Sequence, residues 1–331
     1  MFVTPMAWLL TGGALPVAPP TGPHPLAMGM LAATVVVCCA FAIASAQWRE
    51  RSGPARSVVA DGILRYRNFL AVRDGQADLL RHTLSRREAF FESIAQTPVC
   101  SAVHFDRDTY LRNLARRRPE RNLDPRMLWL LASAKVNQAE RFGVGLAELY
   151  GHLNLEDGEP ARVHVQLQET YHTRILADVV AMFGLPVRPR APRVFVRTFI
   201  KLLVALPEAW QLPLAGCAEM AGCIIFRVLR DRGLELFAGE SQVADRIRLL
   251  YGEILADEIS HVGFIAAQLS SIERDCMRAL YRVLGFRLAC QLPELVRLIG
   301  RAELARQFGA AFRLDEMVAE FPGAAFAAAL I

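Results

Sequence analysis

Two stretches of the chain carry a glutamate followed three residues later by a histidine: Glu169 with His172, and Glu258 with His261. Three positions on a helix correspond to about 300° of rotation, so each pair projects from one helix face and can bind one metal ion. In carboxylate-bridged di-iron bundles, two such helices are joined by one inward glutamate from each of two further helices. This chemistry therefore requires two more glutamates on separate helices.

Glu140 and Glu219 occupy the required places, one before each pair. Glu219 lies among Ala, Gly, Cys, Met, Ile and Phe residues on both sides, which predicts that it is buried. A buried carboxylate is costly unless it is paired or bound to a metal. Glu148 lies on the same predicted helix as Glu140 and could replace Glu140 as the ligand from that helix. Small residues near Glu219 would leave room for metals and a substrate: Gly216, Ala218, Ala221 and Gly222.

Each of these residues alone has an ordinary structural interpretation. A lone histidine on an apolar face is usually a hydrogen-bonded core residue, an isolated Glu140 would be solvated, and Glu219 could pair with a core arginine. Taken jointly, in an order that uses each helix once, they predict a metal site with six ligands: Glu140, Glu169, His172, Glu219, Glu258 and His261. Carboxylate-rich ligation favours Fe(II) or Mn(II) over zinc or copper. We expect two iron ions, with manganese as the alternative.

Neighbours of the six residues could support them. Metal-bound histidines usually donate their second ring N–H to a carboxylate or an amide, so we expect Asp257 to orient His172 and Gln168 to orient His261. Neighbours that could line a substrate pocket, or serve as plain core packing, are Tyr171, Cys217, Met220, Cys223 and Ile254. The histidines to which the sequence assigns no role are His104, His152 and His164.

Helical periodicity, with turn signals between long segments, predicts an all-α protein. The helices expected to position the ligands span about 124–152, 161–183, 195–229 and 241–270. Asp124 and Pro125 mark the start of the first helix, and Ser241 is the expected N-cap of the fourth. The third is expected to bend near Pro207 and Pro213. This is the pattern of a ferritin-like four-helix bundle with extra flanking helices.

Four regions are expected along the chain: an apolar N-terminal segment (1–50), a helical N-terminal extension (51–120), the di-iron four-helix bundle (121–290) and a C-terminal helical tail (291–331). Within the extension, one amphipathic helical stretch begins near Leu64 and a second spans 81–94. A further helical stretch over 272–312 is expected to follow the bundle.

The first 47 residues contain no charged side chain. The apolar run 26–47 is long enough to cross a bilayer, and the arginines after it would keep the following domain cytoplasmic. Three alternatives stay open: cleaved export at a signal-peptidase-like site at 44–46, a buried helical hairpin, and an incorrectly assigned start upstream of Met28 or Met30. The expected location is cytoplasmic, with membrane association through 26–47 if the segment is a true anchor.

Composition limits the function classes further. The chain has 331 residues, of which 53% are hydrophobic and 21% charged, so a sizeable core is expected and disorder is not. The net charge is +5, but no basic run alternates with aromatic residues as a nucleic-acid groove requires, so no nucleic-acid partner is expected. The seven cysteines are scattered and form no C-x-x-C motif, which indicates a reducing compartment.

Four sequence elements between about residues 140 and 284 occur in the same order as in a known enzyme family: Gln168-Glu169-Thr170-Tyr171-His172-Thr173, Ala205-Leu206-Pro207-Glu208-Ala209-Trp210, Glu219, and Asp257-Glu258-Ile259-Ser260-His261. By these motifs the sequence resembles the p-aminobenzoate N-oxygenase family of non-haem di-iron enzymes, whose Met-Pro-Glu-x-Trp pattern the second element follows. One departure concerns an extra histidine ligand that the family carries four residues before the last glutamate. Here that position is Ile254, and the adjacent Glu253 faces about 100° away, which makes it a poor substitute.

The resemblance implies a ferritin-like, O2-dependent monooxygenase. Its two Fe(II) ions would activate O2 to oxidise a small organic substrate, by N-oxygenation of an amine or by hydroxylation, with electrons from a reductase or ferredoxin. With Ile254 in place of the extra histidine, the resemblance extends to O2 activation and not specifically to N-oxygenation. Two other functions stay open: a ferritin-like iron-binding or peroxide-scavenging protein without an organic substrate, and a non-catalytic, membrane-anchored helical protein. The oligomeric state stays open as well, with a homodimer as one possibility.

Overall fold

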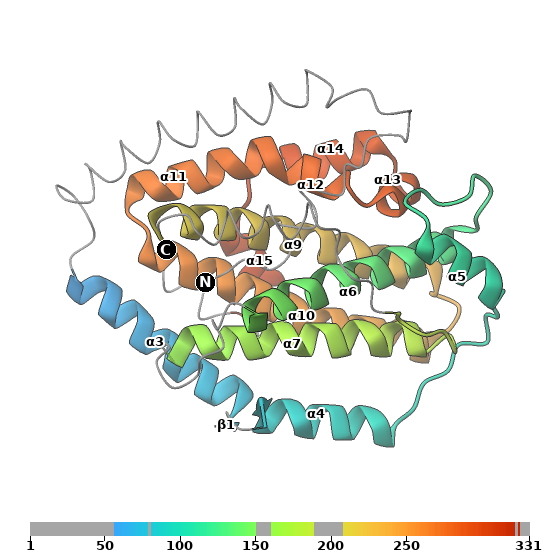
Figure 1. Ribbon diagram of the computed structural model, residues 1–331, viewed down its shortest axis with the longest axis horizontal. Coiled ribbons are helices and arrows are strands. Elements are labelled where there is room, and N and C mark those ends of the chain that lie inside the picture. The colour runs from blue at the N-terminus through green and yellow to red at the C-terminus, as the bar shows by residue number, and fades with distance from the viewer. Residues whose placement is uncertain (1–55, 79–80, 150–159, 189–207, 322–323, 325–331) are drawn as a thin grey trace.

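The computed structural model describes five parts of the chain: 56–78, 81–149, 160–188, 208–321 and residue 324. Long helices packed side by side make up most of these parts (Figure 1). The all-α prediction is therefore confirmed. The expected membrane-anchor segment 26–47 and the start of the third predicted helix, 195–207, lie outside the described residues.

Four long helices form a bundle: α6 (Pro125–Leu149), α7 (Pro160–Ala181), α9 (Glu208–Leu236) and α10 (Ser241–Gln268). Helix α6 packs most extensively on α7, and α9 on α10. Further contacts of α7 with α10 and of α6 with α9 close the bundle. This is the arrangement that the four predicted ligand-bearing segments require.

Polar side chains fix three of these helices against one another inside the core. The Trp129 indole N–H on α6 donates to the Leu229 carbonyl of α9 at 2.7 Å. The Ser133 hydroxyl of α6 lies 2.7 Å from the Tyr251 hydroxyl of α10. Because buried polar groups with partners cost little, these bonds set the relative positions of the helices without weakening the core.

Gly233 allows α9 to continue past the predicted end of the third helix at 229. A Cβ at this position would lie 2.8 Å from Trp129 Cζ2, so only glycine lets α6 and α9 approach so closely. The predicted end of this helix at residue 229 was therefore wrong, because Gly233 serves packing and does not end the helix. The helix ends at Leu236, and Pro213 lies inside its first turns.

The fourth helix also begins differently from its prediction. Ser241 is its first residue, and the N-cap position is occupied by Glu240, whose side chain makes no cap hydrogen bond. The Glu240 carboxylate instead accepts hydrogen bonds from the Ser101 hydroxyl and the Ala102 backbone N–H. The expected cap was therefore wrong by one residue, because tertiary contacts engage the neighbouring carboxylate.

Before the bundle, the chain forms α3 (Arg56–Asp74), α4 (Ser85–Gln96) and α5 (Arg107–Ala115). Helix α3 packs on α7, α10 and α4. A two-residue antiparallel pair, β1 (Ala77–Asp78) with β2 (Thr83–Leu84), connects α3 to α4. The predicted helix over 81–94 therefore begins four residues too early, because the chain turns at Gly75 and His82, both with positive φ.

After the bundle follow α11 (Ser271–Leu280), the π-helical turn η1 (Tyr281–Gly285), α12 (Phe286–Ala289), α13 (Pro293–Ile299), α14 (Arg301–Gly309) and α15 (Leu314–Glu320). The further helical stretch predicted over 272–312 is present but is divided into several short helices. Pro293 starts a new helix, and Gly300, with φ 86°, separates α13 from α14.

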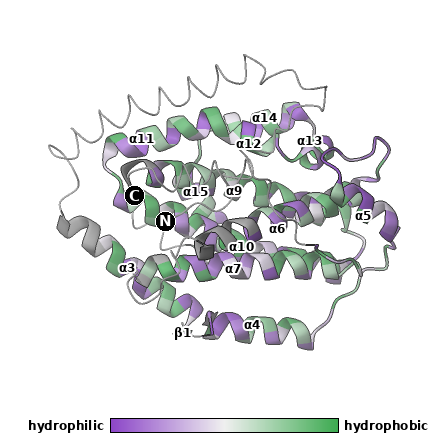
Figure 2. Cartoon of the chain, viewed as in Figure 1, coloured by the Kyte–Doolittle hydropathy of each residue, from purple (hydrophilic) through white to green (hydrophobic). Residues whose placement is uncertain are grey.

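The bundle helix α9 is strongly apolar, as its hydrophobic colouring in Figure 2 shows. Among the described residues, its segment Gln211–Leu236 is the one stretch long and apolar enough to cross a membrane, and 94% of its most apolar window is buried inside the protein. A core helix passes the same length and composition test as a membrane span, and burial in the bundle explains the apolarity of α9.

Candidate metal centre

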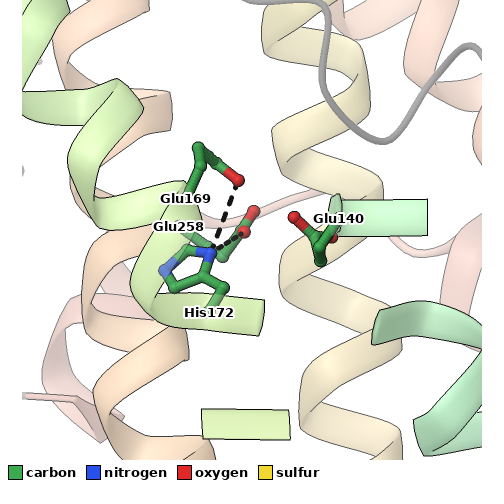
Figure 3. A group of neighbouring side chains, drawn as sticks. All are labelled: Glu140, Glu169, His172 and Glu258. Carbon is green, nitrogen blue, oxygen red and sulfur yellow. Dashed lines mark ion pairs between the residues drawn. The ribbon is translucent and has the colours of Figure 1, made fainter. Parts of the chain in front are cut away.

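The bundle brings together all six predicted site residues. Helix α6 contributes Glu140, α7 contributes Glu169 and His172, α9 contributes Glu219, and α10 contributes Glu258 and His261. Every one of these side chains is at most 1% exposed. Figure 3 shows Glu140 pointing from its own helix toward His172 and Glu258. We call these six residues the carboxylate cluster; their role as metal ligands stays a prediction.

The carboxylate cluster consists of two overlapping groups, each with ligand atoms within 4.8 Å of one another. One contains Glu140 and His172, the other contains Glu219 and His261, and both contain Glu169 and Glu258. Such sharing is the arrangement expected when two carboxylates each contribute to two neighbouring ions. The four carboxylates would also balance the charge of two divalent cations.

The histidines face the shared carboxylates through the same ring atom. His172 Nδ1 lies 3.5 Å from a Glu169 oxygen and 3.4 Å from a Glu258 oxygen. His261 Nδ1 lies 3.3 Å from Glu169 and 3.3 Å from Glu219. The two imidazole centroids are 6.1 Å apart. Both Nδ1 atoms are therefore directed into the carboxylate cluster.

Most acceptor atoms of the carboxylate cluster have no hydrogen-bond partner among the described residues. The unpaired atoms are both oxygens of Glu140, Glu169 and Glu258, one oxygen of Glu219, and His172 Nδ1. Buried polar atoms in folded proteins are nearly always satisfied, and leaving one unpaired costs about 1–3 kcal/mol. Hard oxygen donors at this density fit divalent iron or manganese, whose binding would satisfy them.

The charges of the carboxylate cluster shift its protonation equilibria in opposite directions. Burial raises the pKa of Glu140 and of Glu258, and neighbouring carboxylates raise it further. Burial acts to lower the pKa of His172, but Glu169 and Asp257 outweigh it and raise the value to about 9. For Glu169, burial acts to raise the pKa, but His172 and His261 outweigh it and lower it. In the absence of metal, bound protons thus neutralise part of the negative charge that metal cations would otherwise balance.

Both supporting contacts predicted for the histidines are present. His172 Nε2 lies 3.2 Å from Asp257 Oδ2, and His261 Nε2 lies 2.9 Å from Gln168 Oε1. Each histidine therefore uses its outer nitrogen for a protein partner, as metal-binding histidines usually do.

Three residues beside the site were not identified from the sequence: Arg73, Asp74 and Arg87. Together with Gln168, Glu253 and Asp257, they form a set of buried or half-buried polar side chains that we call the arginine network. A signal was available in the sequence. Arg87 lies on the same helix face as Phe91 and Ile94, and all three are buried on α4. A charged residue in an apolar stripe indicates a buried partner.

Glu253 belongs to the arginine network and not to the carboxylate cluster. Its carboxylate contacts Arg87 at 2.7 Å and Arg73 at 3.1 Å. This supports the prediction that Glu253 does not replace the missing histidine. Ile254, at the position of that histidine, is fully buried.

The small residues of α9 serve different purposes. A Cβ on Gly222 would lie 2.6 Å from Glu258 Oε2, so the absence of a side chain makes room for a carboxylate of the cluster. A Cβ on Gly216 would lie 3.1 Å from Met277 Cγ, so that glycine accommodates α11 instead. The prediction that both glycines surround the site holds for Gly222 and was wrong for Gly216.

The hydroxyl of Tyr171 points away from the carboxylate cluster. This does not fit the role of a pocket residue, which the sequence left open for Tyr171. The hydroxyl donates to Glu88 at 2.6 Å and accepts from the Leu84 N–H at 2.9 Å, on the side of α4. Successive residues of a helix point in different directions, which explains why a neighbour of Glu169 faces away. The other candidates are buried, which fits core packing as well as a pocket: Cys217, Met220, Cys223 and Ile254.

Some predicted features cannot be placed. Pro207 of the Pro-Glu-x-Trp element, His152 and the side chain of Glu148 lie outside the described residues. His164, to which the sequence assigned no role, contacts Asp74 Oδ2 at 2.9 Å, and His104 is exposed.

Comparisons of the chain with protein families, with curated proteins and with solved structures found no match. The resemblance to the p-aminobenzoate N-oxygenases therefore rests on the motifs alone. What the structure adds is an all-helical fold whose buried glutamate and histidine groups could hold metal ions.

Proposed function

We propose that the protein is a non-haem di-iron oxygenase that activates O2 to oxidise a small organic substrate. The observation that supports this most is the convergence of buried, unpaired carboxylate oxygens from four helices around two imidazoles. A protein that used these residues only for stability would pair them, as it pairs the adjoining arginine network.

The residues of the chain would divide the work of holding the two ions. Glu140 and His172 would bind one, Glu219 and His261 the other, and Glu169 and Glu258 both. Bound iron supplies the redox chemistry that O2 activation needs. The protein excludes bulk water, since the carboxylate cluster is buried on every side by the bundle.

The proposed reaction is a monooxygenation. One oxygen atom of O2 is added to the substrate, and the other leaves as water after uptake of two protons and two electrons. A reductase or ferredoxin is proposed as the electron donor. The motif resemblance favours an amine as the substrate, whereas Ile254 at the place of the family's extra histidine leaves hydroxylation at carbon as an equal proposal.

Two alternatives use the same residues differently. A ferritin-like iron-binding or peroxide-scavenging protein would employ the same six ligands without an organic substrate. A non-catalytic helical protein would pair them with arginines. The second alternative is disfavoured by the geometry, because the nearby Arg73 and Arg87 contact the carboxylates of the arginine network instead.

Anaerobic titration of the metal-free, full-length protein with Fe(II) tests the proposal, followed by exposure to ¹⁸O2 with a panel of aryl amines and other small aromatic compounds. We expect two Fe(II) per chain and a product that carries one ¹⁸O atom. Glu219→Gln should lose iron. Its matched control is Glu235→Gln, an exposed position on the same helix that pairs with Arg232; this variant should behave as the wild type.

Each outcome separates the functions. Iron content near zero after loading would reject both iron-dependent functions. Two bound Fe(II) with O2 consumption but no oxygenated product across the panel would favour the iron-binding or peroxide-scavenging protein.

A further inference from the structure

The arginine network lies directly against the outer side of both histidines of the carboxylate cluster. It joins α3 and α4, which precede the bundle, to α7 and α10 within it. Arg87 is its central cation: this α4 side chain is only 3% exposed. A guanidinium buried to this extent requires a full set of acceptors, and Arg87 has them.

Asp257 determines which nitrogen of His172 carries the proton. A carboxylate with arginine partners can only accept hydrogen bonds, so His172 must donate from Nε2 at 3.2 Å. The other nitrogen, Nδ1, then presents its lone pair to Glu169 and Glu258 when the ring is neutral. This is the state that a metal ion requires.

Gln168 determines the same choice for His261. Its amide nitrogen donates to Asp74 at 2.8 Å and to Asp257 at 3.2 Å, and neither carboxylate can donate in return. The amide oxygen must therefore point to His261, where it accepts from Nε2–H at 2.9 Å. The lone pair of His261 Nδ1 is consequently directed toward Glu169 and Glu219.

Arg87 holds both carboxylates on which these choices depend. Its Nε donates to Asp74 at 2.8 Å, and its Nη2 donates to both oxygens of Asp257, at 2.5 and 2.7 Å. Arg73 adds one bond to Asp257 at 2.9 Å, but no hydrogen bond from Arg73 to Asp74 occurs among the described residues. Arg87 is thus the cation that hydrogen-bonds both Asp74 and Asp257, the two carboxylates that the Gln168 amide also bridges.

We propose that Arg87 is a positioning residue that sets the tautomer of both histidines by holding Asp74 and Asp257. This inference rests on the proposed metal-binding function and deepens it: helices α3 and α4 become part of the metal centre. One arginine outside the bundle then controls both metal positions at once, since Gln168 and Asp257 connect His261 to His172.

Four variants of the full-length protein test this proposal: Arg87→Gln, Arg87→Lys, Gln168→Leu and, as a matched control, Arg174→Gln. Arg174 also connects α7 to α4, through Glu88, but has no bond to the arginine network among the described residues. Circular dichroism establishes folding, and anaerobic Fe(II) titration gives the two affinities. Zn(II)-loaded samples, which are diamagnetic, allow the histidine Nε2–H signals to be observed by ¹H–¹⁵N NMR.

We expect Arg87→Gln to weaken both Fe(II) affinities by about 10- to 100-fold, and Arg87→Lys to weaken them less. In the Zn(II) form of Arg87→Gln, the two slowly exchanging Nε2–H signals should broaden or disappear. Gln168→Leu should weaken only one of the two metal positions, the one that contains His261. Arg174→Gln should match the wild type in every readout.

Folded Arg87→Gln with unchanged affinities and both Nε2–H signals would overturn the proposal. Should Arg87→Gln fail to fold, Arg87→Lys and Gln168→Leu decide, and wild-type affinities in both would overturn it. Failure of the wild type to bind Fe(II) or Zn(II) is a separate result, because it rejects the proposed function itself.

Discussion

The carboxylate cluster and the arginine network lie side by side and share helices α7 and α10, and both contain fully buried carboxylates. In the arginine network, Asp74 and Asp257 each contact a guanidinium and further hydrogen-bond donors. In the carboxylate cluster, Glu140 and Glu258 have no hydrogen-bond partner for either oxygen among the described residues.

The difference indicates what each region is for. In the arginine network, each buried carboxylate has an arginine within hydrogen-bond distance. In the carboxylate cluster no arginine does so, and its carboxylates converge where added metal ions could satisfy them. The contrast between the fully buried carboxylates of the two regions therefore supports a metal centre more strongly than the carboxylate cluster does alone.

The largest expected effect comes from changing one carboxylate to its amide in each region. Asp257→Asn breaks the buried ion pairs that Asp257 makes with Arg87 and Arg73 and should lower the free energy of unfolding by about 3–5 kcal/mol. Glu140→Gln should change it by less than about 1 kcal/mol in the metal-free protein, because burial already raises the pKa of Glu140 and favours its neutral form. Urea unfolding in the presence of a chelator measures both, and equal losses would remove the distinction between the regions.

Metal ions should supply what the carboxylate cluster lacks. Mn(II) should stabilise the wild type by about 2.7 kcal/mol at a free concentration 100 times its Kd. Glu219→Gln should show much less stabilisation and Glu235→Gln the full effect. Thermal unfolding under nitrogen measures this stabilisation, and a wild type that does not respond to Mn(II) would contradict the proposed metal centre.

The two regions should also differ in pH dependence. His172 and His261 have pKa values raised to about 9 and about 10, chiefly because Glu169 and Glu219 outweigh burial, so the stability they contribute is complete below their ordinary pKa and is lost as pH rises through 9 to 10. Burial raises the pKa of Glu140 and Glu258, so folding retains protons that the unfolded chain releases, and stability falls with rising pH here too.

The metal-free protein should therefore lose stability between about pH 6.5 and 10, by about 1.4 kcal/mol per pH unit for each extra proton retained in the folded state. Metal binding displaces these protons, so it should tighten over the same range. Asp257 does not contribute there, because burial is outweighed by Arg87 and Arg73 and its pKa is lowered. Chelated samples whose stability rises over this range would contradict the assignment.

A smaller effect on metal affinity is expected when the space beside Glu258 is filled. Gly222→Ala would push on the Glu258 carboxylate, because the new Cβ would lie 2.6 Å from Oε2. Metal affinity should fall about tenfold, or about 1.4 kcal/mol, with little loss of helix content. Gly252→Ala on α10 is the control, since its Cβ meets no atom within 4 Å. Equal metal affinity in both variants would show that Glu258 can move without consequence.

The sequence predicted the carboxylate cluster better than it predicted its support. Glu140, Glu169 and Glu219 could be found because their spacing and order follow from helix geometry and ligand chemistry. Asp74 and Arg87 were missed because they belong to the helices before the bundle, and no local motif connects them to His172. Their only signal was a charged residue on an otherwise apolar helix face, at Arg87.

The fold was predictable to a similar degree. Apolar periodicity correctly indicated the four long helices, whereas helix ends depended on contacts made far along the chain. Gly233 lies beyond the predicted helix end at 229, yet the helix continues through it because Trp129 packs against it. Gly300 does act as a break, with a positive φ. Sequence alone does not distinguish these two uses of glycine.

The most direct test of the metal centre is an anomalous difference map from crystals of the full-length protein grown anaerobically with Fe(II), recorded at the iron absorption edge. We expect two peaks in the bundle: one bonded to His172 Nδ1 and Glu140, the other to His261 Nδ1 and Glu219, with Glu169 and Glu258 reaching both. A map with no peak among these six side chains, or with a histidine bound through Nε2, would contradict it.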